Sequence, residues 1–145
     1  MVNSQQQSVE LRIPRDAKYI AVARLVVAGV GAKVGLSMDD IDDLKVAISE
    51  ACTNVIEHAC GDSETHQEAD VVVMRFIPHE NKLEVEVEDY GAGFDIEQLP
   101  EPELGLPSVD GGLGIYLIRQ LTDDAEIESA PGSGTKVIMT KRLAR

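Results

Sequence analysis

The stretch that most constrains the fold is KLEVEVED, residues 82–89, because apolar and acidic residues alternate along it. A period of two places Leu83, Val85 and Val87 on one face of a β-strand and three glutamates on the other. A strand of this kind belongs in a sheet with one face against a hydrophobic core and one face in water. The chain is therefore expected to build a sheet that is covered on one side only.

Asp89 ends this strand and departs from the pattern. It has the same parity as Val87, so its carboxylate is expected to point toward the covered face. An unpaired charge in such a place costs several kcal/mol, and the carboxylate therefore needs a fixed hydrogen-bond donor. Two donors remain open: backbone amides of the following turn, or an amino group of a ligand bound at the end of the strand.

Hydrophobic periodicity, capping residues and turn residues predict the other elements. Strands are predicted at 8–14, 69–77, 125–130 and 135–143, and helices at 16–33, 37–59 and 113–124. Short turns between consecutive strands indicate hairpins. We expect one domain of the α+β class over residues 1–145. It is a two-layer α/β sandwich, in which three helices cover one face of a mixed, mainly antiparallel sheet.

The second predicted helix carries an apolar stripe that is expected to pack on the sheet. Its members are Ile41, Leu44, Ile48, Ala51 and Val55. A row of polar residues, Glu50, Asn54 and His58, flanks the stripe at intervals of four. Asparagine is a poor residue for the middle of a helix. A carboxylate and an amide one turn apart suit Mg²⁺ and a reacting hydroxyl group, whereas a solvated helix face is the alternative interpretation.

Glycines follow Asp89 directly, in the pattern Asp-x-Gly-x-Gly-Phe. Gly91 and Gly93 permit sharp turns and the close approach of a ligand to the backbone. Near the end of the chain, GSGT places Thr135 at the start of a strand. Thr135 either supports the pocket at Asp89 or is an ordinary turn residue.

Residues 95–111 contain three prolines and no evident secondary structure, which is typical of a lid or a binding loop. The segment Gly112–Leu113–Gly114 then opens a helix. Backbone N–H groups and the helix dipole at such a start suit a phosphate, although a flexible helix start is the alternative. The loop has no Lys or Arg. Mg²⁺ and backbone amides would therefore have to neutralise the charge of a triphosphate.

In this order, the motifs at Glu50/Asn54, at Asp89 and at Gly112–Gly114 resemble the N, G1 and G2 boxes of the Bergerat-fold ATPases. That superfamily includes gyrase, Hsp90, histidine kinases and MutL, and the resemblance spans essentially the whole chain. DLKVAISEACTNVIEHA and GGLGIYLIRQLTDDAEIES are similar to the anti-sigma serine-protein kinases of the RsbW type. The resemblance implies a small dimeric kinase that holds a sigma factor and phosphorylates a serine of an anti-anti-sigma factor.

The resemblance also implies roles for single residues. Asn54 would bind the Mg²⁺ that bridges the ATP phosphates, and Glu50 would be the general base, or would position water in a related ATPase. Asp89 would accept a hydrogen bond from the adenine amino group. His58 would have only a flanking structural role. The other implied contacts are closure of the adenine pocket at Gly91 and Gly93, phosphate binding at Gly112, Leu113 and Gly114, and support of adenine by Thr135.

Charge and composition limit the partners. A formal net charge of −13 disfavours direct binding to nucleic acid or to an anionic membrane. It fits a basic surface on a sigma factor, and plain solubility is the alternative interpretation. The N-terminus lacks a signal peptide pattern, and no apolar run approaches the ~20 residues of a membrane span. Cys52 and Cys60 would be ~12 Å apart along a helix axis, too far for a disulfide. We therefore expect a cytoplasmic protein.

Three other functions are alternatives to an anti-sigma kinase. One is a related switch kinase that activates a phosphatase, but the helix after Gly114 lacks the Gly-Pro type of break associated with that group. Another is a non-catalytic ATP-dependent binding module, which the presence of Glu50 disfavours. A third is the ATPase domain of a histidine kinase, which we do not expect because no phospho-acceptor helix precedes the domain.

Overall fold

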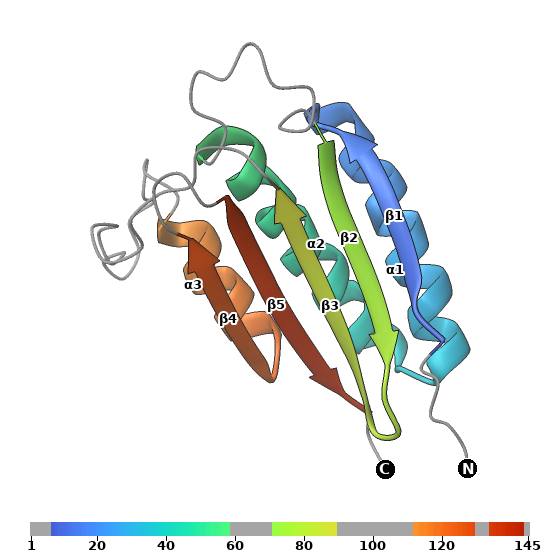
Figure 1. The fold of residues 1–145 in the computed structure, drawn as a ribbon. Coiled ribbons are helices and arrows are strands. Elements are labelled where there is room, and N and C mark those ends of the chain that lie inside the picture. The colour runs from blue at the N-terminus through green and yellow to red at the C-terminus, as the bar shows by residue number, and fades with distance from the viewer. Residues whose placement is uncertain (1–6, 59–70, 90–111, 130–133, 144–145) are drawn as a thin grey trace.

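The computed structural model describes residues 7–58, 71–89, 112–129 and 134–143 (Figure 1). The helices are η1 (Ala17–Tyr19, a 3₁₀ turn), α1 (Ile20–Val34), α2 (Met38–His58) and α3 (Gly112–Leu121). The strands are β1 (Val9–Pro14), β2 (Val71–Pro78), β3 (Lys82–Asp89), β4 (Asp124–Ser129) and β5 (Thr135–Arg142). This order agrees with the elements predicted from the sequence.

The strands form one five-stranded sheet in the order β1-β2-β3-β5-β4. Each pair of neighbours is antiparallel, so the prediction of a mainly antiparallel sheet is confirmed, and no parallel pair occurs among the described strands. β5 lies between β3 and β4, which places Asp89 directly opposite Thr135. The end of β3 therefore meets the start of β5 across a gap of 46 residues in the sequence.

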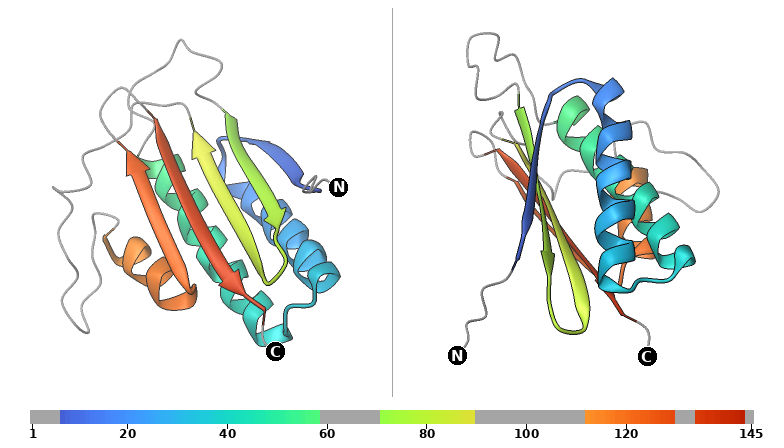
Figure 2. Two further views of the ribbon diagram at one scale, coloured as in Figure 1. Left: turned by 60° about the horizontal axis from the view of Figure 1, so that its bottom comes forward. Right: turned by 90° about the vertical axis from the view of Figure 1, so that its right-hand side faces the viewer.

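All three α-helices lie on one face of the sheet, which confirms the two-layer sandwich (Figure 2). The alternation of β3 has the predicted effect. Leu83, Val85 and Val87 are fully buried, whereas the glutamates between them are partly exposed. The sheet is thus covered on one side and charged on the other.

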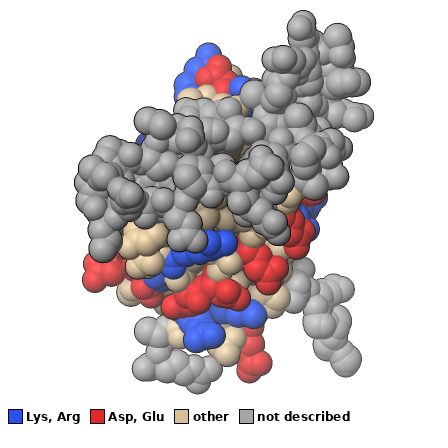
Figure 3. Space-filling model, turned by 90° about the vertical axis from the view of Figure 1, so that its left-hand side faces the viewer, with Lys and Arg blue, Asp and Glu red and all other residues tan. Residues whose placement is uncertain are grey.

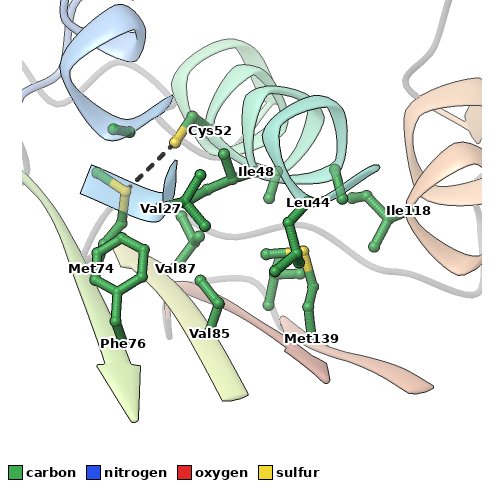
Figure 4. Close-up of a cluster of buried hydrophobic side chains, with 14 of the residues drawn as sticks. Val27, Leu44, Ile48, Cys52, Met74, Phe76, Val85, Val87, Ile118 and Met139 are labelled. Carbon is green, nitrogen blue, oxygen red and sulfur yellow. Dashed lines mark hydrogen bonds between the residues drawn. The ribbon is translucent and has the colours of Figure 1, made fainter. Parts of the chain in front are cut away.

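The hydrophobic core lies between α2 and the sheet (Figure 4). The apolar stripe predicted on α2 is buried and belongs to the same cluster as Phe76 and Met139. Burial of each large apolar side chain stabilises the fold by about 1.5–3 kcal/mol. Cys52 is a core residue: its Sγ lies 3.8 Å from Met74 Sδ, and burial raises the pKa of its thiol to about 12. Cys60 lies outside the described residues.

Two helix boundaries differ from the prediction. α1 begins only at Ile20, because the Asp16 side chain accepts a hydrogen bond from the Lys18 N–H (3.1 Å) and caps a 3₁₀ turn first. α3 ends earlier than predicted, because the Asp123 N–H donates to the Thr140 carbonyl (2.9 Å) and joins the chain to the sheet. In both cases a hydrogen bond made outside the α-helix decides where the helix starts or stops.

The connection between α1 and α2 follows the prediction. Gly35 ends α1 in the left-handed conformation, with φ of 99°, which glycine adopts without a steric penalty. The Ser37 hydroxyl then accepts a hydrogen bond from the Asp40 N–H at 3.1 Å, as the capping box requires. This short link holds the two helices side by side.

A buried lysine fixes α3 against α2. Lys141 Nζ on β5 donates to the Leu121 carbonyl at the end of α3 (2.9 Å). The same ammonium lies 3.3 Å from Asp43 Oδ2 and 3.7 Å from Asp40 Oδ1, both in α2. The ammonium group of Lys141 on β5 therefore contacts both α2 and α3, and these contacts hold α3 in place relative to α2.

Within the described ranges, no helix is long and apolar enough to cross a membrane. The side of the molecule that carries α3 and β4 shows acidic and basic side chains intermixed (Figure 3). On that face the described residues form no continuous basic field of the kind that binds a nucleic-acid backbone.

Candidate active site

Glu50 and Asn54 lie one turn apart on α2, and α3 packs against them. A Cβ atom placed on Gly114 would lie 3.0 Å from Glu50 Oε1 and 3.7 Å from Asn54 Nδ2. The absence of a side chain at Gly114 therefore lets the first turns of α3 approach this carboxylate and this amide. Three residues from two separate sequence motifs therefore come together at one contact.

Asn54 is buried, with 4% of its surface exposed. Its Nδ2 has no hydrogen-bond partner among the described residues. A buried donor without a partner costs about 1–3 kcal/mol, so it needs an explanation. An amide in this state beside a carboxylate is suited to a polar ligand.

Asp89 is also buried, and it is the centre of a second polar group. Its Oδ1 accepts a hydrogen bond from the Thr135 N–H at 3.1 Å. Its Oδ2 accepts from Arg15 Nη2, also at 3.1 Å, and both side chains of this ion pair are at least nine-tenths buried. The carboxylate thus has the fixed donors that its burial requires.

Thr135 supports this group in two ways. Its backbone N–H holds Asp89, while its hydroxyl lies 2.7 Å from the Ser129 hydroxyl across the β4–β5 pair. Ser129 Oγ in turn donates to the Gly134 carbonyl at 3.2 Å. Thr135 is buried and held on both sides, so the position of the Asp89 carboxylate is well defined.

The two polar groups lie at the same end of the molecule. Figure 1 shows that the carboxyl-terminal part of α2, the ends of β1 and β3, and the starts of β5 and α3 all lie at this end. The first group, Glu50, Asn54 and Gly114, lies between α2 and α3. The second group, around Asp89, lies at the ends of the central strands.

Some predicted site residues cannot be compared with the structure. Gly91, Gly93 and the predicted lid at 95–111 lie outside the described residues. Gly112 and Leu113 begin α3, as predicted, but their burial and the Leu113 side chain are not described. His58 is the last residue of α2, and its side chain is likewise outside the described set.

The described residues offer no cluster of three His, Cys, Asp or Glu side chains that could hold a metal ion by itself. Mg²⁺ in nucleotide sites has a different requirement, because one or two protein groups and the substrate phosphates suffice. Asn54, buried beside the Glu50 carboxylate, fits that requirement. The start of α3 beside them provides backbone N–H groups for an anion.

The sequence did not indicate two residues of the site, Arg15 and Ser129. The sequence indicated that the buried Asp89 carboxylate needs a fixed hydrogen-bond donor. It did not indicate which residue supplies that donor. Arg15 is 74 positions away from Asp89 in the sequence, and the order of the strands in the sheet brings the two residues together. Ser129 lies in a strand whose position beside β5 was predicted, but its hydroxyl contact was not.

The chain is similar in sequence to known proteins. The chain matches the histidine kinase-like ATPase domain over residues 13–141. It is 41% identical to the serine-protein kinase RsbW of Bacillus velezensis over 143 residues, which covers 93% of this chain and 85% of that protein. It is 38% identical to the serine-protein kinase RsbW of Bacillus pumilus over 151 residues, which covers 99% and 91% of the two chains.

Two solved structures share the fold. The RsbU and RsbW domains of Rv1364c from Mycobacterium tuberculosis match with a TM-score of 0.70 at 21% identity, covering 96% of this chain and 33% of that one. The histidine kinase domain of the blue-light activated kinase EL346 from Erythrobacter litoralis matches with a TM-score of 0.50 at 18% identity, covering 90% and 62%. At these identities the likeness concerns the fold alone.

Proposed function

The chain belongs to the histidine kinase-like ATPase family, and on that premise we propose that it is a cytoplasmic serine-protein kinase and anti-sigma factor. It uses Mg²⁺-ATP to phosphorylate a serine of an anti-anti-sigma factor, and it binds and sequesters a sigma factor. The observation that carries the proposal is the contact between Glu50, Asn54 and Gly114. It joins a carboxylate that can act as a base, an amide that can hold a metal ion, and a helix start that can bind a phosphate.

Glu50 is the general base of the proposed reaction. Its carboxylate takes the proton of the substrate serine as the serine oxygen attacks the γ-phosphorus and ADP leaves. Asn54 would hold Mg²⁺, and the ion would neutralise negative charge on the phosphates. The backbone N–H groups of Gly112, Leu113 and Gly114 bind the phosphates at the start of α3. The residues of the chain thus act mainly by holding the reacting groups in position and by stabilising charge on the phosphates.

Asp89 binds the other end of the nucleotide in this proposal. Its carboxylate, held by Thr135 and Arg15, accepts from the amino group of adenine. Gly91 and Gly93, directly after Asp89, allow the backbone to close on the base. Both ends of ATP are then fixed at one end of the sheet, where the two polar groups lie.

The proposed partners are proteins. The net charge of −13 favours a basic sigma-factor surface over nucleic acid. A homodimer is supported by the apolar outer face of α1, where Val22 and Leu25 are exposed. Exposed large apolar side chains on a helix, here beside the exposed Arg24, are typical of a contact surface.

A transfer assay tests the function. The protein is incubated with Mg²⁺-ATP and a candidate anti-anti-sigma factor, and phosphoserine is measured by mass spectrometry. Glu50→Ala should lower the rate by about 10²–10⁴-fold, the usual contribution of a general base, while leaving ATP affinity unchanged. Glu80→Gln, an exposed acid in the β2–β3 turn, is the control and should transfer normally.

Two results would decide against parts of this proposal. Transfer at the normal rate by Glu50→Ala would exclude Glu50 as the base. ATP binding without any transfer to the partner, in the unmodified protein, would favour the non-catalytic binding module instead.

A further inference from the structure

Arg15 occupies an unusual place for an arginine. It follows the last residue of β1, and only 8% of its side chain is exposed. Its Nη2 donates to Asp89 Oδ2 at 3.1 Å, while the other carboxylate oxygen is held by the Thr135 N–H at 3.1 Å. The guanidinium thus lies beside the residue that is proposed to read the base of the nucleotide.

The contacts of Arg15 leave part of the guanidinium unused. Its Nε is buried and has no hydrogen-bond partner among the described residues. A buried ion pair is weak evidence for stability, because desolvation of both charges offsets their attraction. An unpaired buried N–H adds a further cost. A pair that served only stability would be expected to satisfy all its donors.

We propose that Arg15 is a specificity-determining residue of the nucleotide site, forming with Asp89 one donor–acceptor pair that reads adenine. This inference rests on the proposed function. Asp89 accepts from the exocyclic amino group, and Arg15 donates to the ring nitrogen beside it. Adenine has two acceptor nitrogens beside that amino group, N1 on one side and N7 on the other.

The same pair rejects guanine. Guanine carries a carbonyl oxygen where adenine carries the amino group, so an acceptor would face the Asp89 carboxylate. Two acceptor oxygens in contact repel each other and form no hydrogen bond, and such a repulsive contact is a common way to discriminate against a wrong ligand. The chemical class that fits the pair is therefore a 6-aminopurine nucleotide.

The planar shape of the arginine side chain matters here. A guanidinium has five N–H donors in a rigid fork, so it can bond Asp89 and a ring nitrogen in one plane. A lysine ammonium is a point charge without that fork. Lysine at this position should preserve the charge beside Asp89 but lose most of the contact to the base.

The test measures dissociation constants for ATP, GTP, 1-deaza-ATP and 7-deaza-ATP by displacement of a fluorescent nucleotide. The proteins are the unmodified chain, Arg15→Lys and Arg15→Met. The unmodified chain should bind one of the two deaza analogues at least about tenfold more weakly than ATP, since a hydrogen bond to a charged donor is lost. Arg15→Met should bind that analogue and ATP equally, and its preference for ATP over GTP should fall about tenfold.

Arg12→Gln is the matched control, because Arg12 on β1 has a side chain that is 63% exposed. It should retain the full analogue penalty. Melting temperatures of all variants separate a folding defect from a loss of recognition. If Arg15→Met does not fold, Arg15→Lys and the analogue series in the unmodified chain still decide the question.

The possible failures are distinguishable. An unmodified chain that binds no ATP contradicts the proposed function itself. A chain that binds ATP but shows no penalty for either deaza analogue, or the same penalty after substitution of Arg15, overturns only the inference about Arg15. Tighter ATP binding by the variants also overturns it, because Arg15 would then occupy the place of the base.

Discussion

At the scale of the residue, the contact between Gly114 and Glu50 determines where the proposed base lies. A Cβ on Gly114 would be 3.0 Å from Glu50 Oε1, which is closer than side-chain atoms normally approach. The neighbour that would have to yield is the end of a flexible carboxylate. A methyl group at this position would therefore move the base while the helix itself remained.

Gly114→Ala should accordingly slow phosphoryl transfer. We expect a loss smaller than the ~10²-fold that a displacement of about 1 Å can cause, because Glu50 Oε1 has to move by only a few tenths of an ångström. Single-turnover transfer with saturating ATP measures this effect, and ATP affinity is measured separately.

A double-substitution cycle shows whether Glu50 carries the effect. In the Glu50→Ala background the carboxylate is absent, so Gly114→Ala should cause no further loss of transfer. An equal loss in both backgrounds would mean that Gly114 acts through the phosphates and not through Glu50.

At the scale of the element, Lys141 holds three elements together. Its ammonium contacts the end of α3 through the Leu121 carbonyl and the start of α2 through Asp43. The site depends on the same packing at the opposite end of these helices, where Gly114 meets Glu50. Loosening of α3 at one end should therefore be detected at the other.

Lys141→Met keeps the length of the side chain and removes the donor. The buried Leu121 carbonyl and the acidic residues of α2 then lose their partner, so unfolding should require about 1–3 kcal/mol less free energy. Urea denaturation measures this. Lys136→Met on the open face is the control, because its Nζ lies 3.7 Å from Glu86 in a partly exposed pair worth about 0–1 kcal/mol. Similar losses in the two variants would refute the role of Lys141.

The open face of the sheet gives a prediction that depends on pH. Burial, followed by the hydrogen bond with Glu84, raises the pKa of the Glu86 carboxyl above its ordinary value of 4.5. A carboxyl whose folded-state pKa is raised stabilises the fold in its protonated form, and this contribution is lost as pH rises through that pKa. Lys136 and Arg75 oppose the shift but do not cancel it.

Glu86→Gln, which resembles the protonated form, should raise the melting temperature at pH 7 and change it little at pH 4. Thermal melts at the two pH values measure the difference. Glu126→Gln, an exposed acid on the same sheet, should have little effect at either pH. A lower melting temperature of Glu86→Gln at pH 7 would contradict the sign of the shift.

The elements also show what the sequence alone can predict. The buried face of β3 and the apolar stripe of α2 were predicted because periodicity is a local property of a strand or helix. The ion pair of Arg15 with Asp89 was not, since it joins residues 74 positions apart and depends on the order of the strands. The contact of Gly114 with Glu50 depends in the same way on how α3 packs.

At the scale of the whole molecule, the open face of the sheet and the helical layer expose different kinds of side chain. The open face of the sheet is charged, with Arg75 placed among Glu10, Glu86 and Glu88. β1 is the last strand of the sheet on the side next to α1 (Figure 1). In contrast to the open face, β1 and α1 expose apolar side chains. The members of this apolar edge are Val22 and Leu25 on the first turns of α1, and Val9 at the far end of β1. An exposed apolar group beside an unpaired strand edge is typical of an interface.

If this apolar edge forms the proposed dimer, Leu25→Glu should produce a folded monomer. Leu25 is 73% exposed, so a charge there costs little in the isolated chain and much inside an interface. Sedimentation equilibrium measures the mass, and circular dichroism verifies the fold. Met38→Glu is the control, because Met38 is 71% exposed at the start of α2, where an acidic side chain is favourable. The control should remain dimeric, and a Leu25→Glu protein that remains dimeric as well would place the interface on another surface.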